Sequence, residues 1–460
     1  MATAERSRSG LPPPLFGTDG VRGQANAEPM TAETVVRLGR ALGCLCTDNG
    51  AHRASVVIGK DTRRSGDMLE SALAAGLCSM GIDALLAGVF PTPGVAFLTR
   101  HMPADAGAVI SASHNPFEDN GLKFFARTGF KLPDDAEREI ERLMCSGGPG
   151  HARPTGAAVG RVRMVTDAAA RYTAFLTRTF PCALAGVKIV VDCAHGAAYR
   201  VAPAVLTGLG AHVVAIGVSP DGANINCDAG ALHPQPLQET VRAQGADLGL
   251  ALDGDADRAI LVDEHGDVVD GDEMLAMLAA AMLSRGTLKQ STVVATVMSN
   301  LGLELALRER GARLVRVQVG DRYVVQEMRR RACNLGGEQS GHLIFLDHAT
   351  TGDGLAAGLS VLRVMVDRQR PLSELKRAMV KFPQVLLNVP VTVRRDLDAI
   401  APVRETIARV NGNLADRGRA LVRYSGTEPL VRVMVEGEDA ARVRAYAQEI
   451  AATITAHVRP

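Results

Sequence analysis

The feature that most constrains the fold of this chain is an alternation along the sequence. Short runs rich in β-branched residues are each followed by a run with helical spacing. Three such pairs are a strand from Ser55 with a helix near 66–79, a strand from Val187 with the Ala- and Val-rich stretch from Ala197, and a strand from Ser291 with a helix near 301–310. This order is typical of right-handed βαβ units in mainly parallel sheets. Because the pattern restarts more than once, we predict three similar mixed-sheet α/β domains.

The C-terminal part of the chain has a different pattern. It predicts strands over 385–393, 420–423 and 431–436 and a last helix over about 438–457. We therefore expect a smaller α+β domain there. Gly/Pro-rich material over 146–154 and Pro371 are candidate linkers. The predicted division is 1–155, 156–258, 259–370 and 371–460.

Composition excludes several classes of function. Lys and Arg number 51 against 50 Asp and Glu, so no broad basic field is available for nucleic acid or anionic lipid. Aromatic residues make up 3% and Trp is absent, which argues against base-stacking platforms. The most apolar helical run, from Met274, is too short to cross a bilayer. We expect partners other than nucleic acid or membrane.

The eight cysteines are scattered, with no pair or cluster at zinc-binding spacing. The N-terminal residues contain no apolar core of the length that a secretory signal needs. We therefore expect a reduced, cytoplasmic protein.

The segment ISASHNP places Ser113 in a tight polar loop at the end of an apolar strand, with His114 and Asn115 beside it. Such a serine could act as a nucleophile, with Lys123 downstream as a cation. A lone loop serine is more often part of a simple turn. The other motifs of the chain decide between these interpretations.

The segment LALDGDADRAILVD carries Asp253, Asp255 and Asp257 between two apolar strands. Three carboxylates this close repel one another unless a cation lies among them, and oxygen ligands favour a hard ion such as Mg²⁺. A calcium EF-hand loop is a competing match, but Arg258 stands where that loop requires Gly. A solvated acidic turn is the remaining alternative. Arg258 would supply a positive charge suited to a phosphate oxygen.

Two further segments indicate sugar and phosphate binding. GEQSGH, from Gly337 to His342, places Glu338, Gln339 and Ser340 among glycines, where a carboxylate and a hydroxyl can bind sugar hydroxyls. The tail segment VRYSGTEPLVR surrounds a turn with backbone N–H groups, hydroxyls and guanidinium groups, a set that suits a phosphate dianion. Its candidate residues are Arg423, Ser425, Gly426, Thr427 and Arg432.

Two N-terminal loops complete the set. FGTDGVRG, from Phe16 to Gly23, holds Arg22 between polar residues and glycines, and alone it would be a surface turn. IGKDTRRSG, from Ile58 to Gly66, offers Arg63 and Ser65 as structural support for the site.

Taken in this order, these segments resemble the α-D-phosphohexomutase family, and within it the bacterial branch that acts on glucosamine phosphates. The resemblance runs from Leu15 to about Gly437 and rests on FGTDGVRG, IGKDTR, ISASHNP, VDCAHGA, DGDADR, VGDRYV, GEQSGH, TTGDG and SGTEP. It implies three similar α/β domains and a smaller fourth one of the TATA-box-binding-protein-like class around a central cleft. It also implies an isomerase (intramolecular phosphotransferase) that interconverts glucosamine 6-phosphate and glucosamine 1-phosphate and supplies UDP-N-acetylglucosamine synthesis for the cell wall.

The resemblance also implies roles for residues. Ser113 would be phosphorylated and would bind one Mg²⁺ per subunit together with Asp253, Asp255 and Asp257. Glu338, Gln339 and Ser340 would hold the sugar, and the tail turn would hold the phosphate that is not transferred. Proton transfer or transition-state electrostatics would fall to His114, Lys123, Arg22, Arg258 and His342. A sugar 1,6-bisphosphate would be the primer, a hexosamine phosphate the partner, and the enzyme a monomer or homodimer.

The chain departs from the family pattern at three places, namely Ala256, where Gly is usual, DAGALHP from Asp228, and Tyr424. Gln339 favours the glucosamine branch. Because an amino group differs little in size from a hydroxyl, a phosphomannomutase/phosphoglucomutase remains the alternative within the family. A non-catalytic sugar-phosphate sensor is the alternative from another class.

Overall fold

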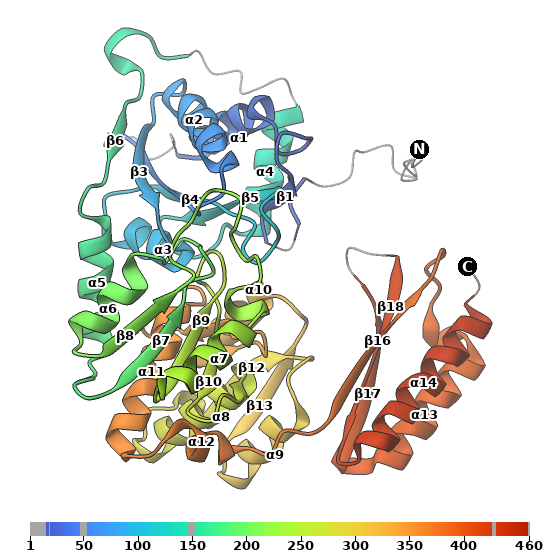
Figure 1. The fold of residues 1–460 in the computed structure, drawn as a ribbon. Coiled ribbons are helices and arrows are strands. Elements are labelled where there is room, and N and C mark those ends of the chain that lie inside the picture. The colour runs from blue at the N-terminus through green and yellow to red at the C-terminus, as the bar shows by residue number, and fades with distance from the viewer. Residues whose placement is uncertain (1–14, 18, 47–52, 146–152, 426–428, 459–460) are drawn as a thin grey trace. The chain divides into compact units, whose positions relative to one another are not determined.

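The computed structural model describes residues 15–17, 19–46, 53–145, 153–425 and 429–458 (Figure 1). The chain divides into two compact units. The first comprises 1–297 and 315–376, and the second comprises 298–314 and 377–460.

The first sheet has the strand order β1-β5-β4-β2-β3-β6. Its strands are β1 (Val21–Gln24), β2 (Ser55–Lys60), β3 (Asp83–Val89), β4 (Ala106–Ile110), β5 (Asp119–Ala126) and β6 (Val162–Met164). The helices in this part of the chain are α1 (Ala32–Cys46), α2 (Ser65–Cys78), α3 (Thr92–His101) and α4 (Asp134–Cys145). Apolar side chains of α1, α2 and α4 pack with those of the strands in one buried core. Pairing is parallel between β2 and its neighbours and antiparallel between β4 and β5.

The second sheet has the order β11-β10-β9-β7-β8. Its strands are β7 (Lys188–Asp192), β8 (His212–Ile216), β9 (Leu248–Leu252), β10 (Ala259–Asp263) and β11 (Val268–Val269), and the helices nearby in sequence are α5 (Ala168–Thr179), α6 (Val201–Gly208) and α7 (Gln235–Gln244). Strands β9 and β10 are buried along their whole length, which explains their continuous apolar sequence.

The third sheet has the order β13-β12-β14-β15. Its strands are β12 (Thr292–Thr296), β13 (Arg313–Val317), β14 (Leu335–Gly337) and β15 (Leu343–Phe345). The helices of this region are α8 (Gly271–Ser284), α9 (Leu301–Glu309), α10 (Asp321–Arg331), α11 (Gly354–Arg368) and α12 (Leu372–Leu375). Helix α8 contains the apolar run from Met274 that the sequence analysis found too short to cross a bilayer. It is buried along its first nine residues and begins at a capping box formed by Asp270 and Glu273.

The three sheets share one topology. In each, four consecutive strands lie in the spatial order fourth, third, first, second: β5-β4-β2-β3, β10-β9-β7-β8 and β15-β14-β12-β13. The third and fourth strands form an antiparallel hairpin in every case. We call these parts of the chain the first, second and third blocks. They confirm the prediction of three similar mixed-sheet α/β domains.

The second unit contains the smaller C-terminal sheet, whose order is β16-β18-β17. Its elements are β16 (Gln384–Pro390), α13 (Ala401–Leu414), β17 (Gly418–Tyr424), β18 (Leu430–Gly437) and α14 (Ala440–His457). The predicted strands and last helix are present, but the sequence analysis missed α13. Its apolar residues Val403, Ile407, Val410 and Leu414 follow helical spacing and contribute to the core of this unit.

Short 3-10 turns connect several of these elements: Gly156–Ala158, Gly230–Leu232, Lys289–Ser291, Lys376–Ala378, Leu397–Ala399 and Ala415–Arg417. The predicted division after 258 falls between β9 and β10, which pair along five residues. The division after 155 falls before β6, which pairs with β3 of the first sheet. The four residue ranges therefore stay a prediction.

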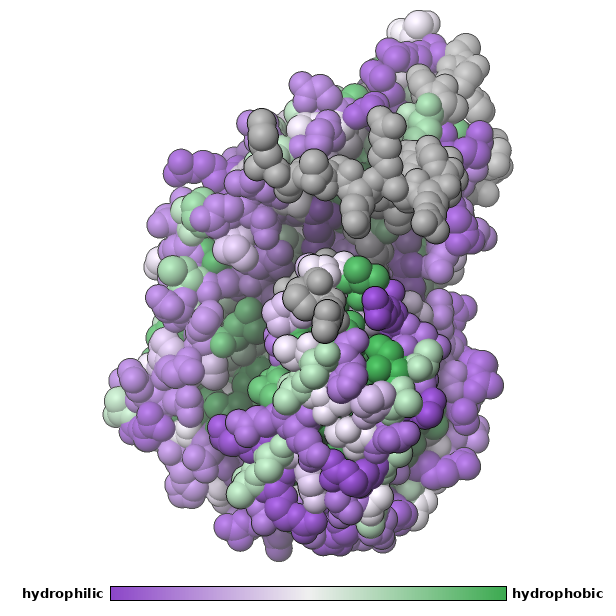
Figure 2. All heavy atoms as spheres, turned by 90° about the vertical axis from the view of Figure 1, so that its right-hand side faces the viewer, coloured by the Kyte–Doolittle hydropathy of each residue, from purple (hydrophilic) through white to green (hydrophobic). Residues whose placement is uncertain are grey.

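The face of the molecule in Figure 2 is mostly hydrophilic, with hydrophobic side chains in small groups between charged and polar ones. Exposed large hydrophobic residues are spread over many elements. Among the described residues, none of the helices combines the length and apolar character that crossing a membrane requires.

Candidate active site

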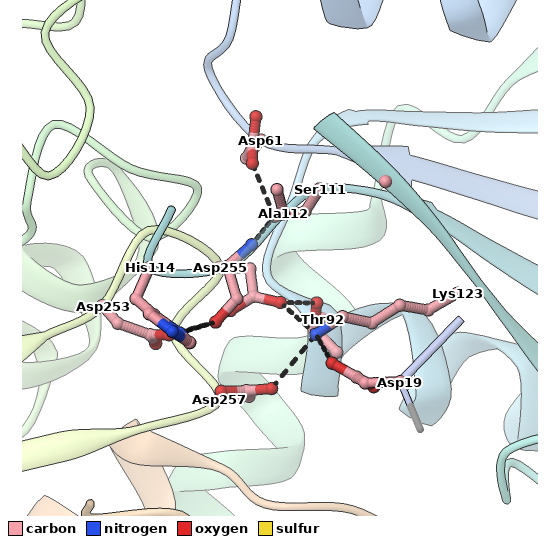
Figure 3. Close-up of polar contacts among 12 residues, drawn as sticks. Asp19, Asp61, Thr92, Ser111, Ala112, His114, Lys123, Asp253, Asp255 and Asp257 are labelled. Atoms are coloured by element: carbon pink, nitrogen blue, oxygen red, sulfur yellow. Dashed lines mark hydrogen bonds and ion pairs between the residues drawn. The ribbon is translucent and has the colours of Figure 1, made fainter. Parts of the chain in front are cut away.

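Ser113 lies in the loop that joins β4 to β5, the hairpin of the first block. Its backbone φ is +53°, a left-handed conformation that is uncommon for a residue with a side chain. The side chain is buried, and its Oγ donates a hydrogen bond to Asp253 Oδ2 at 2.6 Å. His114 Nδ1 lies 3.3 Å from the same Oγ. Figure 3 shows His114 and Asp253 side by side at this point.

Buried polar side chains hold this loop in place. Arg63 Nη2 and Asn226 Nδ2 both donate to the carbonyl oxygen of Ser113, at 3.2 and 2.9 Å. Ser111 Oγ accepts from the Ser113 N–H at 2.9 Å and donates to Asp61 Oδ2 at 2.5 Å. The strained backbone of Ser113 is thus fixed by several hydrogen bonds, as expected for a loop with a functional role.

Asp253, Asp255 and Asp257 lie in the corresponding hairpin loop of the second block, between β9 and β10. One oxygen from each carboxylate lies within 4.8 Å of the others, and all three side chains are buried. Asp255 Oδ1 and Asp257 Oδ1 accept no hydrogen bond among the described residues. Burial, followed by the charges of Asp257 and Asp255, raises the pKa of Asp253 well above its usual value. Buried oxygens without donors and a carboxyl that resists ionisation both fit a site for a hard divalent cation.

The two loops are in direct backbone contact. A Cβ atom on Gly254 would lie 2.6 Å from the carbonyl oxygen of Ser113, so only glycine fits at this position. Ala256 has a φ of +60°, the left-handed conformation that favours glycine. The alanine methyl group is buried, and the loop keeps its three carboxylates at the site.

Lys123, on β5, faces the same carboxylates (Figure 3). Its Nζ lies 2.9 Å from Asp255 Oδ2, 3.3 Å from Asp257 Oδ2 and 3.1 Å from Asp19 Oδ2. Burial would lower the pKa of Lys123, but the three carboxylates outweigh burial and raise the pKa well above its usual value. The three carboxylates therefore favour the protonated form of Lys123.

The other predicted catalytic groups take different places. Burial and the charges of Arg258 and Arg22 lower the pKa of His114 to about 4, so its imidazole is neutral at pH 7. Arg22 Nη1 donates to the carbonyl oxygen of Ala112 at 3.4 Å. Arg258 is anchored through its backbone N–H, which donates to Asp253 Oδ1 at 3.1 Å. Both arginines thus lie beside the loop that carries Ser113, which we call the serine loop, and the loop that carries the three aspartates, which we call the acid loop.

The predicted sugar-binding residues lie in the third equivalent hairpin loop, between β14 and β15. Glu338 Oε1 accepts a hydrogen bond from the Gly320 N–H at 3.1 Å, and Ser340 is exposed. Gln339 Nε2 lies 3.4 Å from Asp270 Oδ2, so this side chain is engaged within the protein. His342 is buried, with Nδ1 3.6 Å from Asp257 Oδ1.

The predicted phosphate-binding residues belong to the second unit. Arg423 on β17 and Arg432 on β18 are directly opposite each other. Burial and the neighbouring Arg432 charge lower the pKa of Arg423. Ser425 is buried, and its carbonyl oxygen accepts from Arg394. Gly426 and Thr427 lie outside the described residues.

The Tyr424 departure has a structural explanation. The guanidinium group of Arg394 lies 5.7 Å above the Tyr424 ring, and the Tyr424 hydroxyl donates to the Arg395 carbonyl oxygen at 2.7 Å. Tyr424 therefore anchors the segment that leads to Arg394.

Several residues of the site were not found by sequence reasoning. Thr92, the first residue of α3, donates through Oγ1 to Asp255 Oδ2 at 2.6 Å (Figure 3). Asp61, Ser111 and Asn226 support the serine loop, and Asp19 binds Lys123. A polar residue directly after an apolar strand was the available signal for Asp61 and Ser111. Thr92 and Asn226 had no signal, because their partners are distant in sequence.

Comparison with known proteins extends the likeness along the chain. Models described as phosphoglucomutase/phosphomannomutase, alpha/beta/alpha domains I, II and III match residues 13–148, 170–266 and 270–382. The model of the C-terminal domain of the same family matches 386–453. A phosphoglucosamine mutase from Anaeromyxobacter dehalogenans is 57% identical over 450 residues, which are 96% of this chain and 98% of that protein.

Solved structures share the fold. A phosphoglucomutase/phosphomannomutase family protein from Burkholderia thailandensis has a TM-score of 0.81 at 25% identity, over 96% of this chain and 97% of that one. N-acetylphosphoglucosamine mutase from Aspergillus fumigatus, solved with GlcNAc-6P and magnesium, has a TM-score of 0.65 at 17% identity, over 97% and 96%. Since the domain models match in chain order and the bacterial relative aligns along almost the whole sequence, this chain belongs to the phosphoglucomutase/phosphomannomutase family.

Proposed function

We propose that this chain is a phosphoglucosamine mutase, an isomerase that interconverts glucosamine 6-phosphate and glucosamine 1-phosphate. The observation that carries the proposal is the Ser113 hydroxyl, which donates to Asp253, one of three buried carboxylates that lie together. This arrangement supports a serine that carries a phosphoryl group beside a divalent cation. The 57% identity to a protein named phosphoglucosamine mutase supports the amino-sugar substrate.

In the proposed reaction the resting enzyme carries a phosphate on Ser113. A free hydroxyl oxygen of the hexosamine monophosphate bonds to phosphorus, the bond from phosphorus to Ser113 Oγ breaks, and the proton lost by the sugar hydroxyl is balanced by a proton gained at Ser113 Oγ. The product of this half-reaction is a hexosamine 1,6-bisphosphate, whose other phosphate then returns to Ser113. One Mg²⁺ per subunit, bound by the Ser113 phosphate with Asp253, Asp255 and Asp257, would neutralise charge on the transferring group.

The local charges indicate which catalytic role each remaining residue of the site takes. Lys123 lies beside the acid triad, so we assign it to stabilising the negative charge of the transition state. His114 is neutral at pH 7 and lies 3.3 Å from Ser113 Oγ, which suits it to accept or return a proton. Arg22, Arg258 and His342 add positive charge or hydrogen bonds around the same loops.

The substrate must bind in two orientations, with either end at Ser113. Glu338 and Ser340 hold two sugar hydroxyls that keep similar places in both orientations. Arg423, Ser425 and Arg432 hold the phosphate that is not transferred. Support for this role is the direct opposition of two arginines, since a dianion between them relieves their repulsion.

The wider setting follows from the same proposal. A sugar 1,6-bisphosphate primes the enzyme, and the product supplies UDP-N-acetylglucosamine synthesis. The Aspergillus fumigatus relative was also solved with glucose 1,6-bisphosphate, which supports such a primer. The enzyme works as a monomer or homodimer in the cytoplasm. Support for a reducing compartment is that no disulfide joins cysteines among the described residues.

The test is a comparison of kcat/KM for the 6-phosphates of glucosamine, glucose and mannose, with Mg²⁺ and a bisphosphate primer. We expect a clear preference for glucosamine 6-phosphate and loss of turnover in Ser113→Ala. Equal or greater activity on glucose or mannose phosphates would favour a phosphomannomutase/phosphoglucomutase instead. Sugar-phosphate binding without turnover, in protein shown to carry the Ser113 phosphate, would favour a sensor.

A further inference from the structure

A chain of buried and half-buried ion pairs leads away from the acid loop. Lys123 Nζ lies 3.3 Å from Asp257 Oδ2 and 3.1 Å from Asp19 Oδ2. Asp19 Oδ1 accepts from Lys131 Nζ, and the same Nζ lies 2.6 Å from Asp321 Oδ2. We call these five side chains the ion-pair chain. Its members alternate in charge from Asp257 to Asp321.

The ion-pair chain joins all three blocks of the first unit, because Asp257 lies in the hairpin loop of the second block. Asp19 precedes β1, Lys123 lies on β5, and Lys131 follows β5, where its backbone bridges to Phe125. Asp321 is the first residue of α10 in the third block. Lys131 is therefore the member that connects Asp19 of the first block with Asp321 of the third block.

The side chains are shielded enough for these contacts to fix positions. The exposed fraction of the side chain is 2% for Lys123, 14% for Lys131 and 11% for Asp321. Burial would raise the pKa of Asp19, but Lys123, Lys131 and Arg22 outweigh burial and hold it well below the usual range. Ion pairs with this little solvent contact are screened less than surface pairs, and removal of one partner leaves an uncompensated charge.

We propose that Lys131 is a positioning residue for phosphoryl transfer, acting on Lys123 through Asp19. This inference rests on the proposed function of the site. Without the Lys131 cation, Asp321 loses its lysine partner, and Asp19 keeps only Lys123 and Arg22 as cationic partners. Asp19 then draws Lys123 away from Asp255 and Asp257, and the cation that stabilises the transition state is misplaced.

A second contact joins the first and third blocks independently of Lys131. It allows a role of Lys131 in positioning the site to be distinguished from a role in holding the two blocks together. Arg322 Nη2 donates to Glu137 Oε1 at 2.7 Å, and the Arg322 guanidinium also binds Asp134. The first and third blocks therefore stay joined when Lys131 is replaced. Loss of Lys131 should thus change the site more than it changes stability.

Lys376 offers a matched control. Its Nζ also binds two carboxylates, Asp263 Oδ2 at 2.6 Å and Asp267 Oδ2 at 3.1 Å, and its side chain is 21% exposed. Asp263 is the last residue of β10, whereas the acid loop precedes the first residue, Ala259. Lys376→Met therefore removes a comparable pair at the opposite end of the strand.

The experiment compares wild type, Lys131→Met, Lys131→Arg and Lys376→Met by kcat, KM for glucosamine 6-phosphate, and unfolding temperature. We expect Lys131→Met to lower kcat 10- to 100-fold, with KM within threefold and an unfolding temperature close to that of Lys376→Met. Lys131→Arg should recover most of the loss. A kcat for Lys131→Met within twofold of wild type, or a loss that Lys376→Met shares, or no recovery in Lys131→Arg, overturns the proposal.

A spectroscopic readout separates this inference from the proposed function. His342 lies 3.5 Å from Asp321 and 3.6 Å from Asp257, so its imidazole senses both ends of the ion-pair chain. Its ¹⁵N resonances, assigned with His342→Gln, should shift in Lys131→Met and stay unchanged in Lys376→Met. If wild type lacks mutase turnover, the proposed function fails. Unchanged His342 resonances in Lys131→Met then overturn the ion-pair chain independently.

Discussion

At the scale of single residues, the site depends on one backbone contact between two loops. Gly254 leaves room for the Ser113 carbonyl oxygen, which also accepts hydrogen bonds from Arg63 and Asn226. The hydroxyl of Ser113 is aimed at Asp253 because its backbone is held from several sides. Gly254 therefore controls the position of Ser113, although Gly254 has no catalytic group of its own.

We predict that Gly254→Ala lowers kcat strongly and the free energy of unfolding by about 1–3 kcal/mol, because the new Cβ overpacks the loop. Its nearest atoms are the Ser113 carbonyl oxygen, the Asn226 amide nitrogen and the Ile225 Cδ1, and the first of these is backbone that cannot move away cheaply. Gly412→Ala in α13 is the control, since its Cβ meets no atom within 4 Å. That control should raise stability by roughly 0.5–1 kcal/mol and leave turnover unchanged. Equal turnover in the two variants would contradict the role of Gly254.

At the scale of elements, the N-terminus of α11 holds a buried carboxyl. Asp353 Oδ1 accepts from the Ala356 N–H at 2.9 Å, and Asp353 Oδ2 accepts from the Tyr172 hydroxyl at 2.8 Å. Burial, only partly offset by these bonds, raises the pKa of Asp353 to about 6 from 3.8. This helix cap is therefore linked to proton binding.

The sign of the pH dependence follows from that shift. Between about pH 4 and 6 the folded state keeps a proton that the unfolded state has lost, so stability falls as pH rises. The change is about 3 kcal/mol and is complete above pH 6. Asp353→Asn keeps a side-chain oxygen that can accept the hydrogen bond of the helix cap but removes the carboxyl group that titrates. The free energy of unfolding of the variant, measured with urea at pH 4 and at pH 7, should rise by about 3 kcal/mol relative to wild type between these two pH values. Parallel pH profiles of the two proteins would contradict the assignment of the raised pKa to Asp353.

The sequence predicted those elements whose apolar strands and turn residues carry local signals. The buried runs of β9 and β10 and the glycine-rich hairpin between β14 and β15 are examples. Helix α13 was missed although its apolar spacing was visible. Thr92 and Asn226 could not be found, because their contacts with Asp255 and Ser113 arise only when distant segments meet.

At the scale of the whole molecule, one topology is used three times for three chemical tasks. The hairpin loop between the third and fourth strands carries Ser113 in the first block, the acid triad in the second, and Glu338 in the third. Equivalent positions in similar folds thus supply the proposed phosphoryl carrier, cation site and sugar site. The phosphate site belongs to the separate second unit.

We predict that Arg423→Met lowers kcat/KM for glucosamine 6-phosphate about 10- to 100-fold, because a charge-assisted hydrogen bond contributes roughly 1.5–3 kcal/mol. Arg409→Met is the control. Arg409 pairs with Glu449 across helices α13 and α14, on exposed side chains, so its loss should leave kcat/KM unchanged. A kcat/KM for Arg423→Met within threefold of wild type would contradict the phosphate-binding role.

The central claim of the account is that Ser113 carries the transferred phosphoryl group. The most direct measurement is to incubate the dephosphorylated enzyme with Mg²⁺ and ³²P-labelled glucosamine 1,6-bisphosphate and to map the label by digestion. The account predicts label on the peptide that contains Ser113, and its transfer to added glucosamine 6-phosphate at the rate of turnover. Full turnover with no label on Ser113 would contradict it.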